Sequence, residues 1–260
     1  MRTTRAGRVA TAAAATVLAV SAAGCSSTAS TKPGGELAGS ITVLEAASLT
    51  SAFAQLGTDF EAAHPGVHVT FSPGPSSGLA QQILAGAKAD VFASASGKNM
   101  KEVTDKGAAG APQTFANNTA EIAVAPASAA KVTSLADLAK PGLKVALCQA
   151  QVPCGVLAHA VLTNAKISLT PVTEGLDVKS TLAYVTNGQA DAAIVYVTDV
   201  LGAGTKVKGV AIPNAQNAST AYPIAVLKAS QNAALAQAFE DYVLSPAGQA
   251  TMAAAGFAKP

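Results

Sequence analysis

The stretch of sequence that decides the fold is SPGPSSGLAQQILAGAKADVFASAS, residues 72–96. Its two prolines and the glycine between them are typical of a turn. Ser76 and Ser77 follow at the start of a segment whose apolar residues recur at helical spacing. Residues 90–93 are a short apolar run that predicts a buried strand. The stretch therefore predicts a turn, a helix and a strand, the repeating pattern of α/β proteins.

The start of this helix is a candidate site for an anion. The first backbone N–H groups of a helix have no partner within the helix, and the helix dipole places partial positive charge there. Ser76 and Ser77 add two hydroxyl donors at the same place. Ser is also among the commonest N-cap residues, so an ordinary helix cap is the alternative interpretation.

Short apolar runs alternate with helical patterns along the rest of the chain, which predicts α/β domains with mostly parallel sheets. Apolar residues at helical spacing, among them Phe53, Leu56 and Phe60, predict a helix between the first two strands. The expected strands are residues 41–44, 67–71, 121–125, 143–147, 191–197 and 221–227. Further helices are expected after Gly97 and at residues 155–165, 178–187, 233–244 and 246–255.

The chain is long enough for two lobes. About 236 residues remain after the N-terminal segment described below, more than a typical single domain contains. We expect residues 41–120 together with 219–260 to form lobe I and residues 121–218 to form lobe II. The crossover segments are expected near residues 117–121 and 218–222.

Residues 1–24 have the pattern of a secretory signal peptide. Three Arg residues precede an Ala-, Val- and Leu-rich run at residues 9–23. That run is too short to span a bilayer, which takes roughly 20 residues. It ends in Gly24-Cys25 and resembles a bacterial lipobox, with Ala22 where Leu is usual. The resemblance implies a lipidated Cys25 as the only membrane anchor of an extracytoplasmic protein. Residues 25–40 are then expected to form a flexible tether.

The charge distribution argues against nucleic acid as a partner. All three Arg residues of the chain lie in the signal peptide, which leaves 14 Lys against 15 Asp and Glu and a net charge of −1. The chain also has no Trp. Nucleic-acid binding is not expected from such a composition, and an anion must be bound without guanidinium groups.

Four uncharged stretches of small and hydroxyl-bearing residues fall at the expected strand ends or helix starts. They are AASLT at 46–50, GPSS at 74–77, QVPCG at 151–155 and AAIVY at 192–196. In doubly wound folds, ligands bind beyond the carboxyl ends of the strands, so these stretches are expected to meet. A pocket of donors without carboxylates suits a fully ionised tetrahedral dianion, which offers only acceptors. This convergence favours the anion site over a simple cap.

The same regions resemble the periplasmic molybdate-binding proteins of ABC importers. The matching segments are AASLT at 46–50, SSGLAQQILAGAKADVFASA at 76–95, VPCG at 152–155, GQADAAIVYVTD at 188–199 and YPIAV at 222–226. The resemblance implies a two-lobed type II periplasmic-binding-protein fold, with a mostly parallel sheet and flanking helices in each lobe. It also implies a monomeric protein that is not an enzyme, uses no cofactor, and delivers molybdate or tungstate to the permease subunits of an importer.

The resemblance places the oxyanion site on five residues. The family's two serine ligands fall on Ser48 and Ser76, and its tyrosine hydroxyl falls on Tyr196. Its two main-chain N–H donors fall on Cys154 and Val178. The resemblance implies no protein-ligated metal cation, because the metal enters as an oxyanion.

Three positions depart from the family pattern. Pro75 stands where the family has Ala or Ser, and it lacks an N–H. Cys154 stands where Ala is common, although a main-chain donor does not depend on its side chain. Glu45 stands where the family tends to be apolar, and its charge would weaken anion binding if it faced the cleft.

Cys148 and Cys154 are the two cysteines left in an oxidising compartment, and we predict a disulfide that stiffens the loop between them. The alternatives are two buried thiols or a metal site, which would usually need two more ligands nearby. His64, His68 and His159 are isolated, and none is expected to be a ligand.

Two other functions stay open. A protein of the same fold could bind another small oxyanion such as sulfate. A secreted hydrolase could use Ser48 or Ser76 as a nucleophile, but it would need a base such as His159 within hydrogen-bond reach.

Overall fold

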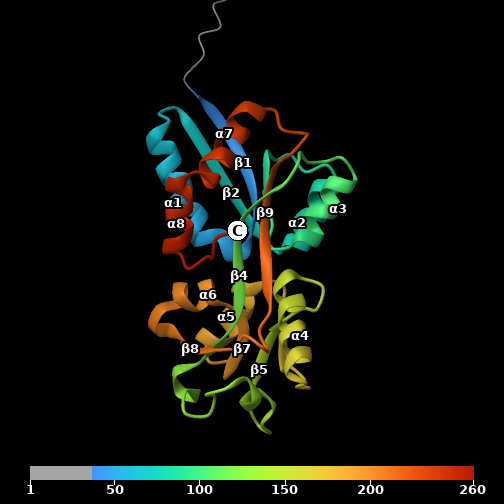
Figure 1. Cartoon of the computed structure of the whole chain (residues 1–260), viewed down its shortest axis with the longest axis vertical. Coiled ribbons are helices and arrows are strands. Elements are labelled where there is room, and N and C mark those ends of the chain that lie inside the picture. Colours follow the sequence, from blue (N-terminus) through green and yellow to red (C-terminus); the bar gives the residue numbers. More distant parts are fainter. Residues whose placement is uncertain (1–36) are drawn as a thin grey trace, which may run out of the picture. The chain divides into compact units, whose positions relative to one another are not determined.

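The computed structural model describes residues 37–260. The predicted signal peptide, the lipidation site Cys25 and most of the predicted tether lie outside the described residues. The described chain is an α/β fold whose strands form one mixed network of nine strands with helices packed on both sides (Figure 1). Within residues 37–260, no helix is long and apolar enough to cross a membrane.

The strands of lobe I form around β1 (Gly39–Ala46). This strand pairs in parallel with β2 (Val67–Gly74) and with β3 (Val91–Ala93). A late strand of the chain, β9 (Ser219–Val226), pairs with β3 in the antiparallel direction. Since β1 and β2 are parallel and in full register, both end at the same edge of the sheet.

Helices cover both faces of this part of the sheet (Figure 1). One face carries α1 (Thr50–Ala63), α7 (Ala233–Leu244) and α8 (Pro246–Ala254), whose apolar residues share a core with Ile41 and Val43 of β1. The other face carries α2 (Ser76–Leu84) and α3 (Gly97–Asp105), which pack against Leu44. The alternation of residues 41, 43 and 44 between two cores is the period-two pattern of a strand buried on both faces.

Lobe II has its own strands and core. Its strand β5 (Val145–Cys148) pairs in parallel with β6 (Thr173–Gly175) and β7 (Ala192–Tyr196). Helices α4 (Pro153–Ala165) and α5 (Val178–Thr186) pack against these strands. The chain then continues through α6 (Val197–Ala203) and β8 (Lys208–Ala211). Buried side chains of these elements form a second large apolar core, which includes Leu147, Val161, Val185 and Ile194.

One long strand, β4 (Gln113–Val124), connects the two groups of strands. Its residues 113–119 pair with β9, and its residues 120–124 pair with β7 and β8. All of these pairings are antiparallel, so the sheet is parallel within each lobe and antiparallel where β4 and β9 join in. The segments expected as crossovers, near residues 117–121 and 218–222, fall within β4 and at the start of β9.

The predicted elements differ from the observed ones mainly in length. The strand expected at residues 121–125 begins eight residues earlier, at Gln113. Two strands, β6 and β8, were not predicted. Short 3₁₀ helices complete the fold, namely η1 (Ala47–Leu49), η2 (Pro126–Ser128), η3 (Leu135–Ala139) and η4 (Gly204–Lys206).

Candidate functional site

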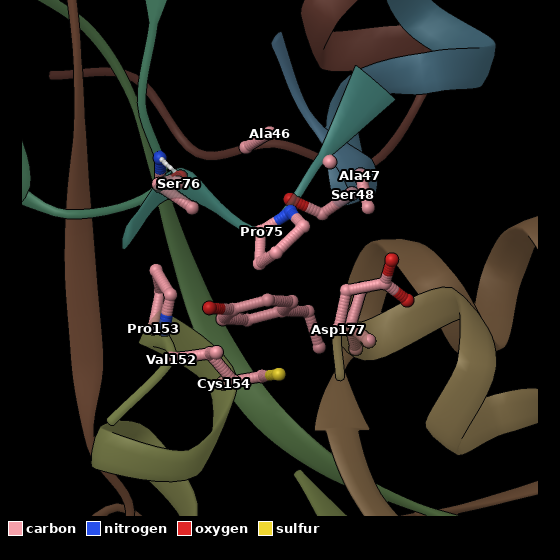
Figure 2. Close-up of a pocket in the computed structure, with 13 residues that line it drawn as sticks. Ala46, Ala47, Ser48, Pro75, Ser76, Val152, Pro153, Cys154 and Asp177 are labelled. Atoms are coloured by element: carbon pink, nitrogen blue, oxygen red, sulfur yellow. Dashed lines mark hydrogen bonds between the residues drawn. The ribbon is translucent and has the colours of Figure 1, made fainter. Parts of the chain in front are cut away.

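A small hollow lies where the ends of β1 and β2 meet the starts of several helices (Figure 2). Its lining residues are Ala46, Ala47, Ser48, Gly74, Pro75, Ser76 and Ala95 from lobe I, and Val152, Pro153, Cys154, Asp177, Val178 and Tyr196 from lobe II. The cavity volume is about 20 Å³. A cavity needs about 10–15 Å³ on this measure to hold one water molecule. The hollow therefore suits one small species and not a sugar or a peptide.

All five residues that the resemblance points to line this hollow. Ser48 and Ser76 come from lobe I, whereas Cys154, Val178 and Tyr196 come from lobe II. The fold thus gathers residues that are up to 148 positions apart in the sequence around one point. Ser77, the second hydroxyl in the opening stretch, lies in the wider groove outside the hollow.

Three helices begin at the hollow. Helix α2 starts at Ser76 directly after Pro75, α4 starts at Pro153, and α5 starts at Val178. Each helix start carries backbone N–H groups without an intrahelical partner and the positive end of a helix dipole. Pro75 at the N-cap of α2 and Pro153 at the first position of α4 each lack an N–H, so these two helix starts offer only the N–H groups that follow the proline. These helix starts favour an anion without an arginine, although the Asp177 carboxylate also lines the hollow.

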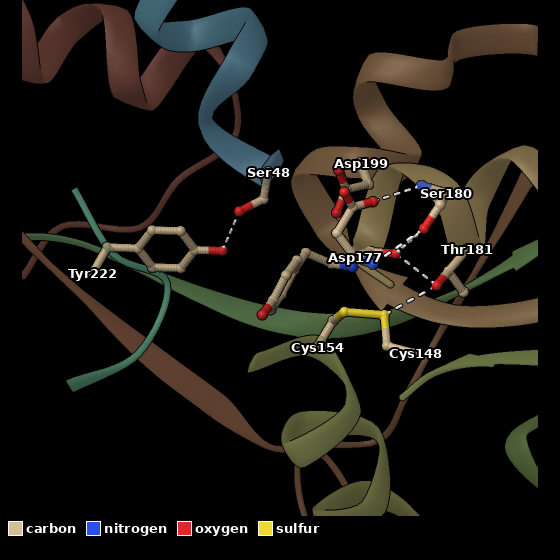
Figure 3. The surroundings of a disulfide bond; sticks show 9 residues. Ser48, Cys148, Cys154, Asp177, Ser180, Thr181, Asp199 and Tyr222 are labelled. Carbon is tan, nitrogen blue, oxygen red and sulfur yellow. Dashed lines mark hydrogen bonds between the residues drawn. A yellow bond between two sulfur atoms is a disulfide. The ribbon is translucent and has the colours of Figure 1, made fainter. Parts of the chain in front are cut away.

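Both serine hydroxyls have a hydrogen-bond partner beside the hollow. The Ser48 hydroxyl lies 2.9 Å from the Tyr222 hydroxyl, and both residues are buried (Figure 3). The Ser76 hydroxyl oxygen accepts the backbone N–H of Ala95 at 3.0 Å. Because Ser76 accepts this bond, its own hydroxyl proton is free to be donated to a ligand.

The Tyr196 hydroxyl is buried without a hydrogen-bond partner anywhere in the described chain. Burial, with the nearby Tyr222 and Asp199 adding to it, holds the pKa of Tyr196 well above its ordinary value, so the phenol is neutral and keeps its proton. An unpaired buried hydroxyl costs about 1–3 kcal/mol. A ligand that accepts a hydrogen bond in the hollow would remove that cost.

A disulfide joins the end of β5 to the start of α4. Cys148 and Cys154 are bonded, with their Cα atoms 5.7 Å apart. The Thr181 hydroxyl of α5 donates to the Cys148 sulfur at 3.1 Å (Figure 3). The disulfide therefore joins the end of β5 to the start of α4 and also contacts the first turn of α5.

The backbone near the disulfide is packed so closely that positions 155 and 175 have no room for a Cβ atom. A Cβ added to Gly155 would lie 1.9 Å from the backbone oxygen of Gln149. A Cβ added to Gly175 would lie 2.2 Å from the Thr181 hydroxyl oxygen. Both contacts are far inside van der Waals distance, so the backbone around Cys154 and Val178 is held tightly.

Three charged residues near the hollow were missed in the sequence analysis. Asp177 lines the hollow, so the expectation of a pocket without carboxylates was wrong. Asp177 is the N-cap of α5, and its carboxylate accepts the backbone N–H of Ser180 at 2.7 Å. The sequence signal was its capping box, Asp177 followed three residues later by Ser180.

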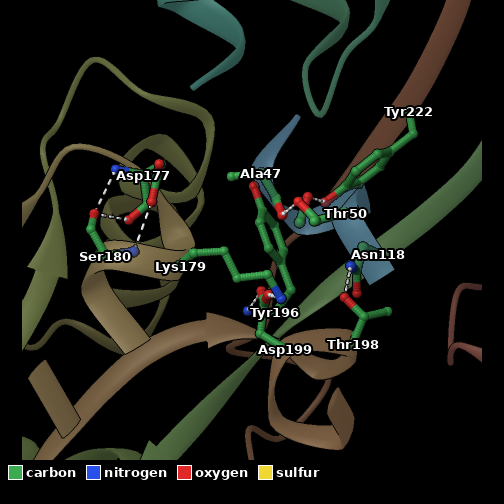
Figure 4. A network of polar contacts seen from close by, with 11 residues as sticks. Ala47, Thr50, Asn118, Asp177, Lys179, Ser180, Tyr196, Thr198, Asp199 and Tyr222 are labelled. Atoms are coloured by element: carbon green, nitrogen blue, oxygen red, sulfur yellow. Dashed lines mark hydrogen bonds and ion pairs between the residues drawn. The ribbon is translucent and has the colours of Figure 1, made fainter. Parts of the chain in front are cut away.

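The other two form an ion pair. The Lys179 ammonium nitrogen lies 3.1 Å from Oδ1 of Asp199, whose side chain is fully buried (Figure 4). Burial raises the pKa of Asp199 to about 6, although Lys179 opposes that rise. Lys179 directly follows Val178, so this ion pair lies next to the proposed donors of α5.

Glu45 is buried and directly precedes, in the sequence, two residues that line the hollow. It is 1% exposed, and within residues 37–260 its two carboxyl oxygens have no hydrogen-bond partner. Burial raises the pKa of Glu45 to about 8, against the attraction of Lys179. Glu45 does not line the hollow itself, although its neighbours Ala46 and Ala47 do.

None of the thirteen residues that line the hollow is a histidine. His159 lies on α4 and is exposed, whereas Ser48 and Ser76 contact Tyr222 and Ala95. In the described chain, no group of three or more His, Cys, Asp or Glu side chains could hold a metal ion. The ionisable side chains that line the hollow with these serines are Asp177 and Tyr196.

This chain is similar, over about 85% of its length, to proteins described as binding molybdate or as part of a molybdenum transporter. A molybdate-binding protein of Mycobacterium tuberculosis is 46% identical over 222 residues, which cover 85% of each chain. The solved substrate-binding domain of a putative molybdenum ABC transporter from Clostridium difficile is 30% identical, with a TM-score of 0.66 over 85% of this chain and 99% of that one. The molybdate-binding protein of Azotobacter vinelandii has the same fold, with a TM-score of 0.75 at 23% identity over 85% of this chain and 99% of that one.

The family model that describes bacterial extracellular solute-binding proteins matches residues 41–258, which is nearly all of the described chain. The chain belongs to the family of bacterial extracellular solute-binding proteins, and its fold is the two-lobed α/β fold of type II periplasmic binding proteins.

Proposed function

We propose that this protein captures molybdate or tungstate outside the cytoplasm and delivers it to the permease subunits of an ABC importer. The observation that carries the proposal is the hollow of about 20 Å³ in which Ser48, Ser76, Cys154, Val178 and Tyr196 meet. The molybdate-binding relatives support it, since one of them is 46% identical over most of both chains.

The donor set suits a tetrahedral dianion. Three hydroxyls and the main-chain N–H groups of Cys154 and Val178 can all donate, and a fully ionised oxyanion can only accept. Charge-assisted hydrogen bonds contribute roughly 1.5–3 kcal/mol each. Five such bonds, less the costs of desolvation and closure, are enough for the ~8–12 kcal/mol of micromolar-to-nanomolar binding.

Cavity size is the proposed basis of selectivity. A rigid ring of donors that fits molybdate cannot reach all the oxygens of the smaller sulfate ion at once. A protonated phosphate would need an acceptor, and Asp177, which lines the hollow, uses only one carboxylate oxygen for the Ser180 N–H. Discrimination against phosphate therefore rests on the size of the cavity and not on the lack of an acceptor. We therefore expect molybdate and tungstate to bind more tightly than sulfate or phosphate.

Binding is proposed to close the two lobes of the protein around the anion. Lobe I, residues 41–120 and 219–260, and lobe II, residues 121–218, close around the anion, because donors from both lobes meet it only in the closed state. Cys25 anchors the protein to the membrane by its lipid, and the protein acts as a monomer. It catalyses no reaction, which is supported by its membership of the family of extracellular solute-binding proteins.

Isothermal titration calorimetry of the mature protein with molybdate, tungstate, sulfate and phosphate tests the proposal. We expect molybdate and tungstate to bind with micromolar or lower Kd and sulfate at least tenfold more weakly. Tighter binding of sulfate would support the alternative of a sulfate-binding protein with this fold. Absence of binding for all four anions would contradict the proposed function.

A further inference from the structure

Three ionisable side chains lie beside the hollow but are not among the proposed donors. We call Glu45, Lys179 and Asp199 the acid–lysine cluster. Glu45 directly precedes the lining residues Ala46 and Ala47, and Lys179 directly follows Val178. Lys179 on α5 and Asp199 on α6 form an ion pair, and Figure 4 shows the Lys179 side chain reaching toward Asp199. Glu45, at the end of β1, lies near enough for the charge of Lys179 to act on it.

The cluster holds two buried carboxyl groups but one cation. Lys179 lies 3.1 Å from Oδ1 of Asp199, and Asp199 also accepts the backbone N–H of Tyr196 at 3.3 Å. The oxygens of Glu45 have no hydrogen-bond partner in the part of the chain that the structure describes. A buried carboxylate without partners is far more costly than a buried neutral acid. Asp199 is therefore the ionised member of the cluster at neutral pH, and Glu45 is the neutral one.

The surroundings of Glu45 offer little else that could compensate its charge. Its partners on the neighbouring strands are Pro73 and Ala93, and both η1 and α2 lack charged residues. The titratable groups on or beside the elements that pack around β1 and the hollow are His68 on β2, Asp59 and Glu61 on α1, Lys98, Lys101, Glu102 and Asp105 on α3, Asp90 beside β1, Asp177, Lys179 and Tyr184 at α5, Tyr196 on β7, Asp199 on α6, Tyr222 on β9, and Glu240, Asp241 and Tyr242 on α7. Lys179 is the cation whose charge acts on Glu45.

We propose that Glu45 couples anion capture to a proton: the protein binds the dianion with Glu45 protonated, and it loses affinity when Glu45 ionises. This inference rests on the proposed function. Glu45 precedes Ser48 by three residues, and neighbouring Cα atoms are about 3.8 Å apart. The Cα atom of Glu45 therefore lies at most about 11 Å from that of Ser48, where the anion is proposed to bind. A negative charge at that range in a buried site repels a dianion strongly.

Binding of the anion changes the number of protons bound to Glu45. Burial raises the pKa of Glu45 to about 8 in the unliganded protein, and a bound dianion would raise it further. Above about pH 8, binding therefore takes up one proton from solvent onto the Glu45 carboxylate, and the affinity falls by up to tenfold for each further pH unit. Below about pH 7 the carboxyl is already protonated, and the affinity no longer depends on it.

The test is calorimetry with molybdate near pH 7 and near pH 9, in pairs of buffers that differ in ionisation enthalpy. Both pH values lie above the pKa of about 6 of Asp199, so Asp199 stays ionised throughout. For the wild-type protein we expect a Kd about tenfold higher at the upper pH and an uptake that approaches one proton there. Glu45→Gln should bind equally well at both pH values and take up no proton from this position.

Glu174→Gln is the matched control, because Glu174 is exposed on β6 and the substitution makes the same change of charge. It should behave like the wild-type protein. Wild-type binding with the same Kd at both pH values and no proton uptake would overturn the role of Glu45 and leave the proposed function intact. Absence of molybdate binding at both pH values would instead overturn the proposed function. The wild-type proton uptake decides the question even if Glu45→Gln does not fold.

Discussion

At the scale of single residues, Tyr196 places a buried hydroxyl without a partner at the hollow of the described chain. Its ring is held by the packing of β7 and lies 6.1 Å, centroid to centroid, from the ring of Tyr222. Its hydroxyl is buried and unpaired within the described chain. Folding therefore leaves one hydrogen bond unmade at this point, and an oxyanion in the hollow can make it.

We predict that Tyr196→Phe weakens molybdate binding by about tenfold or more, since one hydrogen bond to a charged group is lost. The unliganded protein should be as stable as the wild type or slightly more so, because the substitution removes an unsatisfied buried hydroxyl. Calorimetry and urea denaturation measure the two quantities. Tyr242→Phe, on α7 and away from the hollow, is the control. Equal loss of affinity in both variants would contradict the assignment.

A second prediction concerns the stability of the unliganded protein against pH. The usual pKa of a Glu is 4.5, and burial raises that of Glu45 to about 8. Between these values the native state binds more protons than the unfolded state, so this group lowers the free energy of unfolding as pH rises. Glu45→Gln should therefore be more stable than the wild type near pH 9, by roughly 2–4 kcal/mol, and not near pH 4.

Urea denaturation at a series of pH values measures this difference. Glu174→Gln should follow the wild-type curve, because that side chain is exposed. Parallel curves for the wild type and Glu45→Gln would show that Glu45 is hydrated and not buried in solution.

The sequence was enough to predict the residues that line the hollow, but not the ion pair or the buried carboxyl groups beside it. Ser48, Ser76, Cys154, Val178 and Tyr196 stand in recognisable segments, and the fold brings all five to one hollow. The Lys179–Asp199 pair was missed because its partners are 20 residues apart and come together only when α5 packs beside α6. Burial, which sets the pKa of Glu45 and Asp199, is likewise a property of the packed lobes.

At the scale of elements, the disulfide is the feature that shapes the site most directly. It closes a loop with a sequence separation of six residues, from the end of β5 to the second residue of α4. Through Thr181 it also contacts the first turn of α5. Both lobe II helix starts at the hollow are therefore tied to one covalent link.

We predict that the double variant Cys148→Ser, Cys154→Ser loses about 2 kcal/mol of unfolding free energy, the chain-entropy value for so short a loop. Its molybdate affinity should fall as well, because the Cys154 and Val178 N–H groups are no longer held in place. Denaturation and calorimetry of the oxidised wild type, the reduced wild type and the variant measure this. Mass spectrometry after thiol labelling without reductant should find Cys148 and Cys154 unlabelled. Labelling of both would contradict the disulfide.

Local patterns predicted most elements, and the exceptions have a physical cause. Helices α4, α5, α7 and α8 begin within two residues of their expected positions, since their apolar spacing and helix-start residues are local signals. Strands β6 and β8 are three and four residues long, and each pairs along a single edge. The first half of β4 has polar residues such as Asn117 and Asn118, whose partners are the distant β9 and Thr198.

At the scale of the whole described chain, the connection between the lobes could not be predicted in detail from sequence. The order of elements predicts two α/β lobes, but the pairing of β4 with β9, β7 and β8 depends on contacts between segments about 70 to 110 residues apart. The two crossovers are neighbouring strands that hydrogen-bond to each other at residues 117–119 and 219–221. A two-stranded connection of this kind restricts relative motion of the lobes to bending and twisting about these strands.

The last prediction concerns lobe closure. Residues from both lobes line one hollow of about 20 Å³, which is the arrangement that the proposed closure of the lobes requires. An anion in this hollow joins the lobes, and a ligand that binds only the closed state shifts the population toward it. Small-angle X-ray scattering should therefore show a smaller radius of gyration in the presence of molybdate than in its absence. At a free concentration of about 100 times Kd, molybdate should also stabilise the folded protein by about 2.7 kcal/mol.

Ser48→Ala is the informative variant, because it removes a lobe I donor and leaves the lobe II donors in place. Molybdate should then bind more weakly and, at equal concentration, produce a smaller compaction and a smaller rise in thermal stability. Ser77→Ala, in the wider groove outside the hollow, is the matched control and should respond like the wild type. A wild-type protein that binds molybdate with no change in radius of gyration would show that the lobes are already closed without the anion, and closure would then not be driven by the ligand.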